Sequence, residues 1–199
     1  MSSPKTLLEM SGASLIPSAL SQSVIISIDC QNEYVNGGIA LPDITPALEE
    51  AARVLAAGRK AGTPILHIAH RGRAGGAFDP DGPRGQIVDL VRPEGDEAVI
   101  WKPLPNAFAN TDLHQALQKI GRKELILIGF QTHMCVSSTA RAALDLGYRC
   151  TIVDKASGTR DLPIPGGGVI SAPDLHRASL AALADRFAII APTAADLPV

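Results

Sequence analysis

Three side chains that could cooperate in nucleophilic chemistry lie far apart in this chain of 199 residues. Asp29 ends the apolar run "VIISID", Lys102 follows the apolar run "AVIW", and Cys135 follows the run "ELILIGF" after a short turn. A thiol attacks a carbonyl carbon as a thiolate, so it needs a base and a positive charge nearby. A carboxylate can take the thiol proton and later give it to a leaving group. The three residue types therefore predict acyl-transfer chemistry, provided that the fold brings them together.

Short apolar runs alternate with helical patterns along the chain, which predicts where these residues lie. Apolar periodicity, caps and glycine stops predict six strands and four long helices. The alternation indicates a single-domain, three-layer α/β/α fold around a mainly parallel six-stranded sheet. Ligands bind beyond the carboxyl ends of the strands in such sheets, so Asp29, Lys102 and Cys135 are expected at one edge. The predicted strands are 24–29, 64–70, 98–101, 124–130, 149–154 and 187–191, and the predicted helices are 44–62, 111–121 (with Thr111 as its N-cap), 135–147 and 172–186.

Each of the three side chains also has an ordinary role open to it. Asp29 could cap a loop, Lys102 could be one of many solvated lysines, and Cys135 could be a small buried hydrophobic residue. Their expected meeting at one edge favours a site. Cys135 is expected in the first turn of its helix, near Lys102, and both features would lower the thiol pKa. The sequence therefore predicts a sulfur that is ionised near neutral pH.

Composition excludes several other classes of function. The net charge of −2, with scattered Lys and Arg, gives no footprint for nucleic acid or an anionic membrane. No apolar run approaches the length of a membrane span. The three cysteines have no regular spacing, which favours a reducing, cytoplasmic setting over a disulfide framework. Residues 1–22 are predicted to be a weakly ordered N-terminal lead-in to a single domain over 23–199.

Three segments carry a family resemblance: "VIISIDCQNEY", "WKPLPNAF" and "GFQTHMCVSSTARAALDLGY" occur in this order. They resemble the signature segments of the isochorismatase-like cysteine hydrolases, which include nicotinamidases, N-carbamoylsarcosine amidohydrolases and isochorismatases. The segment 161–190 is similar to the C-terminal part of the same family, so the likeness covers roughly residues 22–191. The resemblance implies a Rossmann-like hydrolase domain over 23–199. It also implies a homo-oligomer, a dimer or tetramer, that completes its pocket with a neighbour's residues.

The resemblance also implies roles for individual residues. The family's catalytic aspartate and lysine match Asp29 and Lys102, and its nucleophile, in a Gly-x-x-Thr-x-x-Cys segment, matches Cys135. By the same resemblance, the bond between Phe130 and Gln131 would be a cis peptide, and the N–H groups of Gln131 and Cys135 would form an oxyanion hole. We expect the substrate pocket to include Tyr34, Phe130 and His133.

Two departures from the family pattern bear on the substrate and on metals. The family often has Asp-Phe where this chain has Glu33-Tyr34, which changes the pocket near Asp29. Nicotinamidases bind a metal through an Asp-x-His pair and further histidines, but residues 31–43 contain no histidine. His67 and His70 lie three apart on a predicted strand and so point to opposite faces. The sequence thus predicts no metal, no cofactor, and a small-molecule substrate other than nicotinamide.

Some questions stay open at this level. The Gly- and Pro-rich segment 71–96 could be a mobile surface loop, a lid or a subunit contact, and "PGGGV" at 165–169 favours a flexible connection. The leading functional hypothesis is a cysteine hydrolase that cleaves the C–N bond of a small amide or carbamoyl compound through a thioester. The alternatives are vinyl-ether hydrolysis of an isochorismate-like acid, started by an aspartic acid without a thiol, and a non-catalytic relative.

Overall fold

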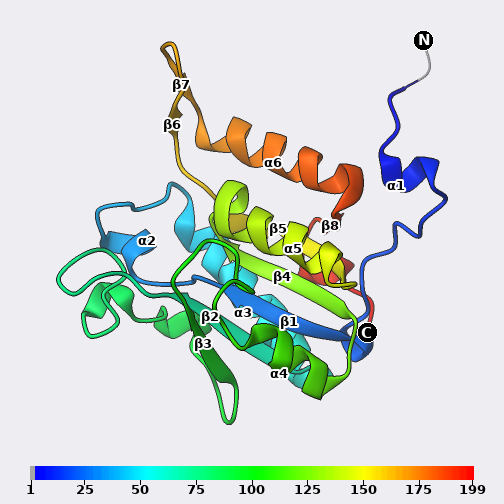
Figure 1. The fold of residues 1–199 in the computed structure, drawn as a ribbon, viewed down its shortest axis with the longest axis horizontal. Helices are drawn as coiled ribbons and strands as arrows, with labels where there is room; N and C mark the ends of the chain where they lie inside the picture. The colour runs from blue at the N-terminus through cyan, green and yellow to red at the C-terminus, as the bar shows by residue number, and fades with distance from the viewer. Residues whose placement is uncertain (1–2) are drawn as a thin grey trace.

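A six-stranded, all-parallel sheet forms the centre of the protein, which the computed structural model describes over residues 3–199 (Figure 1). Every neighbouring pair of its strands is parallel, which confirms the predicted α/β class. The strands in spatial order are β3 (Ala98–Lys102), β2 (Ile65–His70), β1 (Ser23–Ile28), β4 (Glu124–Phe130), β5 (Arg149–Gly158) and β8 (Ala188–Ala191).

Helices cover both faces of the sheet because successive strand residues point to opposite sides. Ile25 and Ile126 belong to the core on the side of α3 (Ile44–Ala61). Their neighbours Ile26 and Leu125 belong to the core on the opposite side, with residues of three other helices. Figure 1 shows these three helices on the near face of the sheet and α3 behind it. They are α4 (Leu113–Ile120), α5 (Ser137–Asp145) and α6 (Ala172–Arg186).

Most of the predicted elements match the structure, and the differences have local causes. The strand over 124–130 and the helix over 172–186 have the predicted bounds. The helix predicted to begin at Cys135 begins two residues later, because residues Thr132–Val136 form a π-helix. Thr111 is not the N-cap of α4; that position is Asp112, although the Thr111 hydroxyl accepts the N–H of Leu113 at 3.3 Å.

Short elements complete the described chain. A two-stranded hairpin, which the sequence pattern did not predict, projects from the body beside α6 (Figure 1). Its loop includes Gly166, Gly167 and Gly168, all with positive φ. The lead-in contains a helix whose residue Leu8 is buried, and the N–H of Leu7 donates to Asp185 Oδ1 at 2.8 Å. The short elements are α1 (Leu7–Met10), η1 (Leu20–Gln22), α2 (Glu33–Asn36), η2 (Pro83–Gly85), η3 (Asp89–Val91), β6 (Leu162–Pro163), β7 (Val169–Ile170) and η5 (Ala194–Asp196).

The segment 71–96 packs against the sheet edge that carries Asp29. Gln31 forms an isolated antiparallel bridge with Ile87, and its side-chain Nε2 donates to the carbonyl of Gly85 at 2.7 Å. Phe78 from the same segment is buried. Over residues 3–199, the helices fall short of the length and apolarity that a bilayer crossing requires.

Gly58 lets α3 approach β1 closely, which makes it a test of this packing. A Cβ at Gly58 would lie 2.2 Å from Ile25 Cδ1. We expect Gly58→Ala to lower the free energy of unfolding by about 1–3 kcal/mol through overpacking, partly offset by the helix propensity of alanine. Adding Ile25→Val removes Cδ1 and should recover most of the loss in urea denaturation. Strictly additive losses in the double variant would contradict this close approach.

Candidate active site

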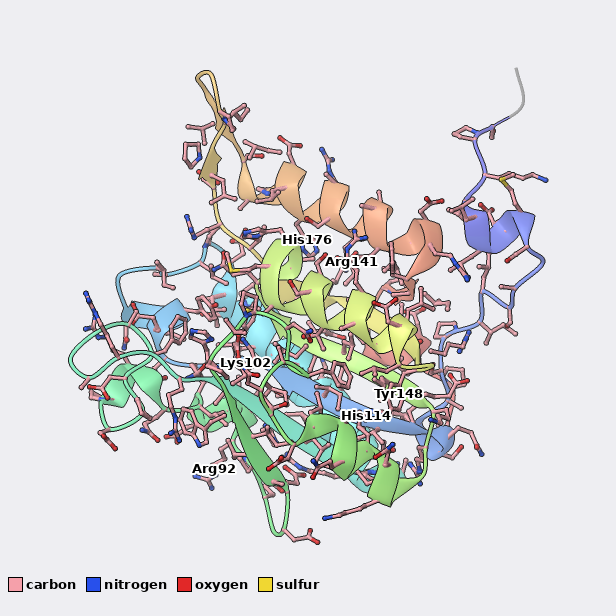
Figure 2. All side chains as sticks on the ribbon, in the orientation of Figure 1. Arg92, Lys102, His114, Arg141, Tyr148 and His176 are labelled. Carbon is pink, nitrogen blue, oxygen red and sulfur yellow. The ribbon has the colours of Figure 1, made fainter. Side chains whose placement is uncertain are left out.

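The carboxyl edge of the sheet brings Asp29, Lys102 and Cys135 into contact. Lys102 Nζ lies 2.8 Å from Asp29 Oδ2 and 3.2 Å from Cys135 Sγ. Lys102 and Asp29 are fully buried, and Cys135 is 4% exposed. Figure 2 labels Lys102 at this edge of the sheet. The three side chains that the sequence singled out therefore form one buried cluster, although they are widely separated along the chain.

Each of the three is placed by the way its strand ends. Asp29 directly follows β1 with a φ of 51°, in the left-handed region that non-glycine residues rarely adopt, so the chain turns there. Lys102 is the last residue of β3. Cys135 follows β4 through Gly129, where a Cβ would lie 2.0 Å from the carbonyl oxygen of Ile28. Only glycine allows β4 to approach β1 this closely, which gives the glycine of the motif a steric role.

The turn that carries Cys135 contains the peptide bond expected to be cis and is held by side-chain contacts that the sequence pattern did not predict. The peptide bond between Phe130 and Gln131 is cis. The Thr132 hydroxyl donates to the carbonyl of Gly158 at 3.0 Å, and its oxygen lies 2.8 Å from His176 Nδ1. His176, labelled on α6 in Figure 2, lies with Nε2 2.7 Å from Asp154 Oδ1. No spacing rule would pair these residues, because they come from three different elements.

Burial has the largest effect on the pKa values of Asp29 and Cys135, and it contradicts the prediction of an ionised thiol. Burial raises the pKa of the Asp29 carboxyl, while the Lys102 ammonium acts in the opposite direction. Burial also raises the pKa of the Cys135 thiol to about 12; the Asp29 charge adds to this rise and Lys102 opposes it. The prediction of a thiol ionised near neutral pH was therefore wrong. Cys135 lies in a buried π-helix, not in an open first turn of an α-helix.

The Asp29 carboxylate retains the capacity to accept a proton. Lys102 Nζ is close to Oδ2, yet within residues 3–199 neither Asp29 oxygen has a partner with hydrogen-bond geometry. A buried carboxylate without such partners gains by taking a proton from a neighbouring thiol. The cluster can thus move one proton between Cys135 and Asp29 beside a fixed positive charge.

The three residues expected to line the substrate pocket, Tyr34, Phe130 and His133, differ in how deeply they are buried. Tyr34 and Phe130 are both buried, with their rings edge to face at 5.9 Å, and burial raises the pKa of the Tyr34 phenol. His133 is half-buried, and its Nδ1 lies 2.6 Å from Thr159 Oγ1. Phe130 and Thr159 also border a cavity of about 220 Å³ between the N-termini of α3 and α6.

The histidines of β2 have separate partners. His67 Nε2 lies 3.0 Å from Glu97 Oε2, whereas His70 Nδ1 lies 3.4 Å from Lys102 Nζ. Over the part of the chain that the structure describes, no three His, Cys, Asp or Glu side chains are grouped so that they could hold a metal ion.

Comparison with known proteins places the chain in a family. The model of the isochorismatase domain matches residues 23–195.

The chain belongs to the isochorismatase family.

Several relatives of this family member are similar over most of its length. An uncharacterized isochorismatase family protein, YddQ, from Bacillus subtilis is 38% identical, covering 88% of this chain and 98% of that protein. A secreted isochorismatase effector from Verticillium dahliae is 36% identical, covering 83% and 85%. A maleamate amidohydrolase from Pseudomonas putida is 28% identical, covering 68% and 72%. The crystal structure of an isochorismatase from Pseudomonas putida has a TM-score of 0.93 at 46% identity, covering 98% and 100%.

The ion pair between Lys102 and Asp29 should dominate the stability of this edge. We expect Lys102→Met to lower the free energy of unfolding by about 3–5 kcal/mol at neutral pH, because it leaves a buried carboxylate without its cation. Without the ammonium, the folded-state pKa of Asp29 rises further above its ordinary value of 3.8. The loss should therefore be absent below that value and grow as the pH rises.

The matched variant Lys102→Met with Asp29→Asn removes both charges and should recover most of this loss at neutral pH. Urea denaturation of both variants at acidic and neutral pH measures the effect. An equal loss at both pH values would contradict the assignment of the cost to an ionised Asp29.

Proposed function

We propose that this isochorismatase-family protein is a cysteine hydrolase that cleaves the C–N bond of a small amide or carbamoyl compound. The observation that carries the proposal is the contact of one buried ammonium, Lys102 Nζ, with both Asp29 Oδ2 and Cys135 Sγ. A base, a nucleophile and a fixed cation in contact are the groups that acyl transfer requires. A relative named maleamate amidohydrolase supports an amide substrate.

In the first half of the reaction, Asp29 accepts the thiol proton while Cys135 Sγ bonds to the carbonyl carbon. Because the pKa of the thiol is raised by burial, the proton leaves as the C–S bond forms, and no free thiolate has to accumulate. The backbone N–H groups of Gln131 and Cys135 hold the oxygen that becomes negative. Within residues 3–199, the Gln131 N–H has no hydrogen-bond acceptor, so it is free for this role.

In the second half, the proton on Asp29 passes to the departing nitrogen, the C–N bond breaks, and a thioester on Cys135 remains. Asp29 then takes a proton from a water molecule, which attacks the thioester carbonyl. The C–S bond breaks, the acid product leaves, and the proton returns from Asp29 to Cys135. Lys102 keeps its charge throughout and balances the negative charge on either the carboxylate or the sulfur. All proton transfers are carried by this chain's own residues, and the proposal includes no metal or cofactor.

A second candidate is vinyl-ether hydrolysis of an isochorismate-like acid. The raised pKa of Asp29 suits the aspartic acid that starts this reaction, and the similar crystal structure is named an isochorismatase. The vinyl-ether reaction uses no thiol, however, so it leaves the contact between Lys102 and Cys135 without a role. In a non-catalytic relative the whole buried cluster would have no role, although burying its charges costs free energy of folding.

The setting of the protein completes the proposal. The partner is a small molecule, and a homo-oligomer follows from the family resemblance. Cys30, Cys135 and Cys150 are buried and free, which is compatible with the reducing, cytoplasmic environment that we propose.

We expect Cys135→Ala to lower kcat by at least about a thousandfold, because it removes the nucleophile. The assay is ammonia release from a panel of small amides, ureas and lactams. The matched control is Cys150→Ala, a buried cysteine of β5 outside the cluster, which should keep activity close to that of the unchanged protein. Mass spectrometry of a trapped thioester on Cys135 gives a second readout. Full ammonia release by Cys135→Ala would exclude the thioester route.

The pH dependence follows from the direction of the Asp29 shift. Asp29 must be ionised to accept the thiol proton, and its pKa lies above the ordinary 3.8. We expect kcat/KM to fall as the pH drops through this raised pKa, with Asp29→Asn inactive at every pH. Activity that persists unchanged down to pH 3.8 would contradict Asp29 as the base.

A further inference from the structure

We propose that His70 is a fourth, positioning residue of this site, which holds the Lys102 ammonium in place by accepting a hydrogen bond from it at Nδ1. The inference rests on the proposed function, because it concerns the same cluster. His70 Nδ1 lies 3.4 Å from Lys102 Nζ. Neither the mechanism above nor the family motifs use this histidine.

The sheet itself places the two side chains together. His70 is the last residue of β2 and Lys102 is the last residue of β3, and they are direct register partners. Partners in neighbouring parallel strands project to the same face. The spatial order β3-β2-β1-β4 therefore sets Lys102, His70, Asp29 and the Cys135 turn at four successive strand ends. His70 occupies the one strand end in this series that the proposed chemistry leaves without a role.

The contacts of the ammonium support the assignment. A lysine ammonium has three N–H donors and no acceptor. Its three contacts here are Asp29 Oδ2 at 2.8 Å, Cys135 Sγ at 3.2 Å and His70 Nδ1 at 3.4 Å. Because Lys102 is fully buried, the third contact limits rotation of the ammonium about its Cε–Nζ bond. An ammonium held in this way keeps its charge beside both the carboxylate and the sulfur.

The backbone and ring of His70 are themselves fixed. The Gln31 side chain accepts the N–H of His70 at 2.8 Å through Oε1 and donates to its carbonyl at 3.0 Å through Nε2. Gln31 is fully buried. The Phe78 ring packs edge to face on the imidazole at 5.2 Å. Gln31 thus fixes the backbone of His70 and Phe78 packs on its ring, so that the imidazole is kept beside Lys102.

The surroundings require a neutral imidazole. Nδ1 can accept from Lys102 only when the proton of the neutral ring sits on Nε2. Burial lowers the pKa of His70, the Lys102 charge lowers it further, and the Asp29 charge acts in the opposite direction. Gln31 and Phe78, which pack on His70 from other segments, carry no charge. The neighbouring Arg71 has its guanidinium 5.5 Å above the Trp101 ring.

Protonation of His70 would therefore disable this contact. An imidazolium has no acceptor for the ammonium and adds a second positive charge beside Lys102. Since the pKa of His70 lies below the ordinary 6.5, the imidazole is neutral at pH 7 and becomes charged only as the pH falls below 6.5. The Lys102 ammonium should then lose its acceptor on His70.

The test uses iodoacetamide as the probe and measures the alkylation rate of Cys135 by peptide mass spectrometry on the full chain. This readout needs no substrate, so it stays informative even if no amide is turned over. We compare His70→Leu, which removes the acceptor, with His70→Asn, whose amide oxygen can lie near the position of Nδ1. His67→Gln is the matched control, because His67 lies on the same strand but contacts Glu97.

We expect His70→Leu to slow Cys135 alkylation at neutral pH by about tenfold or more, the value of one lost hydrogen bond to a charged group. His70→Asn and His67→Gln should stay within about threefold of the unchanged protein. The unchanged protein should also show a steeper break in its rate profile below pH 6.5 than His70→Asn, which retains only the effect of Asp29.

Three outcomes would overturn the proposal: normal or faster alkylation in His70→Leu, His70→Asn as slow as His70→Leu, or the same low-pH break in His70→Asn. The last would assign the break to Asp29. If His70→Leu fails to fold, the comparison of His70→Asn with the unchanged protein decides. The proposed function fails separately, through loss of the requirement for Cys135 in turnover.

Discussion

The arrangement of this site depends on one buried positive charge, the Lys102 ammonium. An isolated ammonium in a protein interior costs several kcal/mol, so a partner of opposite charge must lie beside it. Asp29 supplies that charge at 2.8 Å, and the thiol of Cys135 lies 3.2 Å from the same nitrogen. With one proton shared between sulfur and carboxylate, the cluster is neutral in either arrangement. Moving that proton therefore changes no net buried charge.

The shared proton explains why the raised pKa of the thiol is compatible with nucleophilic chemistry. When two ionisable groups interact strongly, the observed titrations belong to the pair and not to either residue. Burial disfavours a second negative charge, so Asp29 and Cys135 cannot both be ionised readily next to a single ammonium. Burial thus limits the site to one negative charge, and that charge can move to the atom that needs it as a substrate reacts.

The parallel sheet brings Asp29, Lys102 and Cys135 together. Its carboxyl edge collects residues from strand ends, and the order β3-β2-β1-β4 sets them side by side. Asp29 adopts a left-handed conformation where β1 ends. Gly129 has no Cβ, and this allows β4 to approach β1 closely. From α6, His176 reaches the same edge through Thr132 and supports the turn that carries Cys135. The covering layers therefore also position the site, beyond shielding the sheet from water.

The sequence by itself determined the layers, most element bounds to within one or two residues, and the three chemistry-bearing strand ends. These depend on local patterns: continuous apolar runs such as 124–130, caps, glycine stops, and the rule that parallel strands share an edge. The hairpin was missed because strands of two residues show no periodicity. The contacts of His70 with Lys102 and of His176 with Thr132 join residues more than thirty positions apart, and no local pattern records them. Only the tertiary structure decided the ionisation of Cys135, because desolvation depends on everything that surrounds a group in space, and a strand end looks the same in the sequence whether it is open or buried.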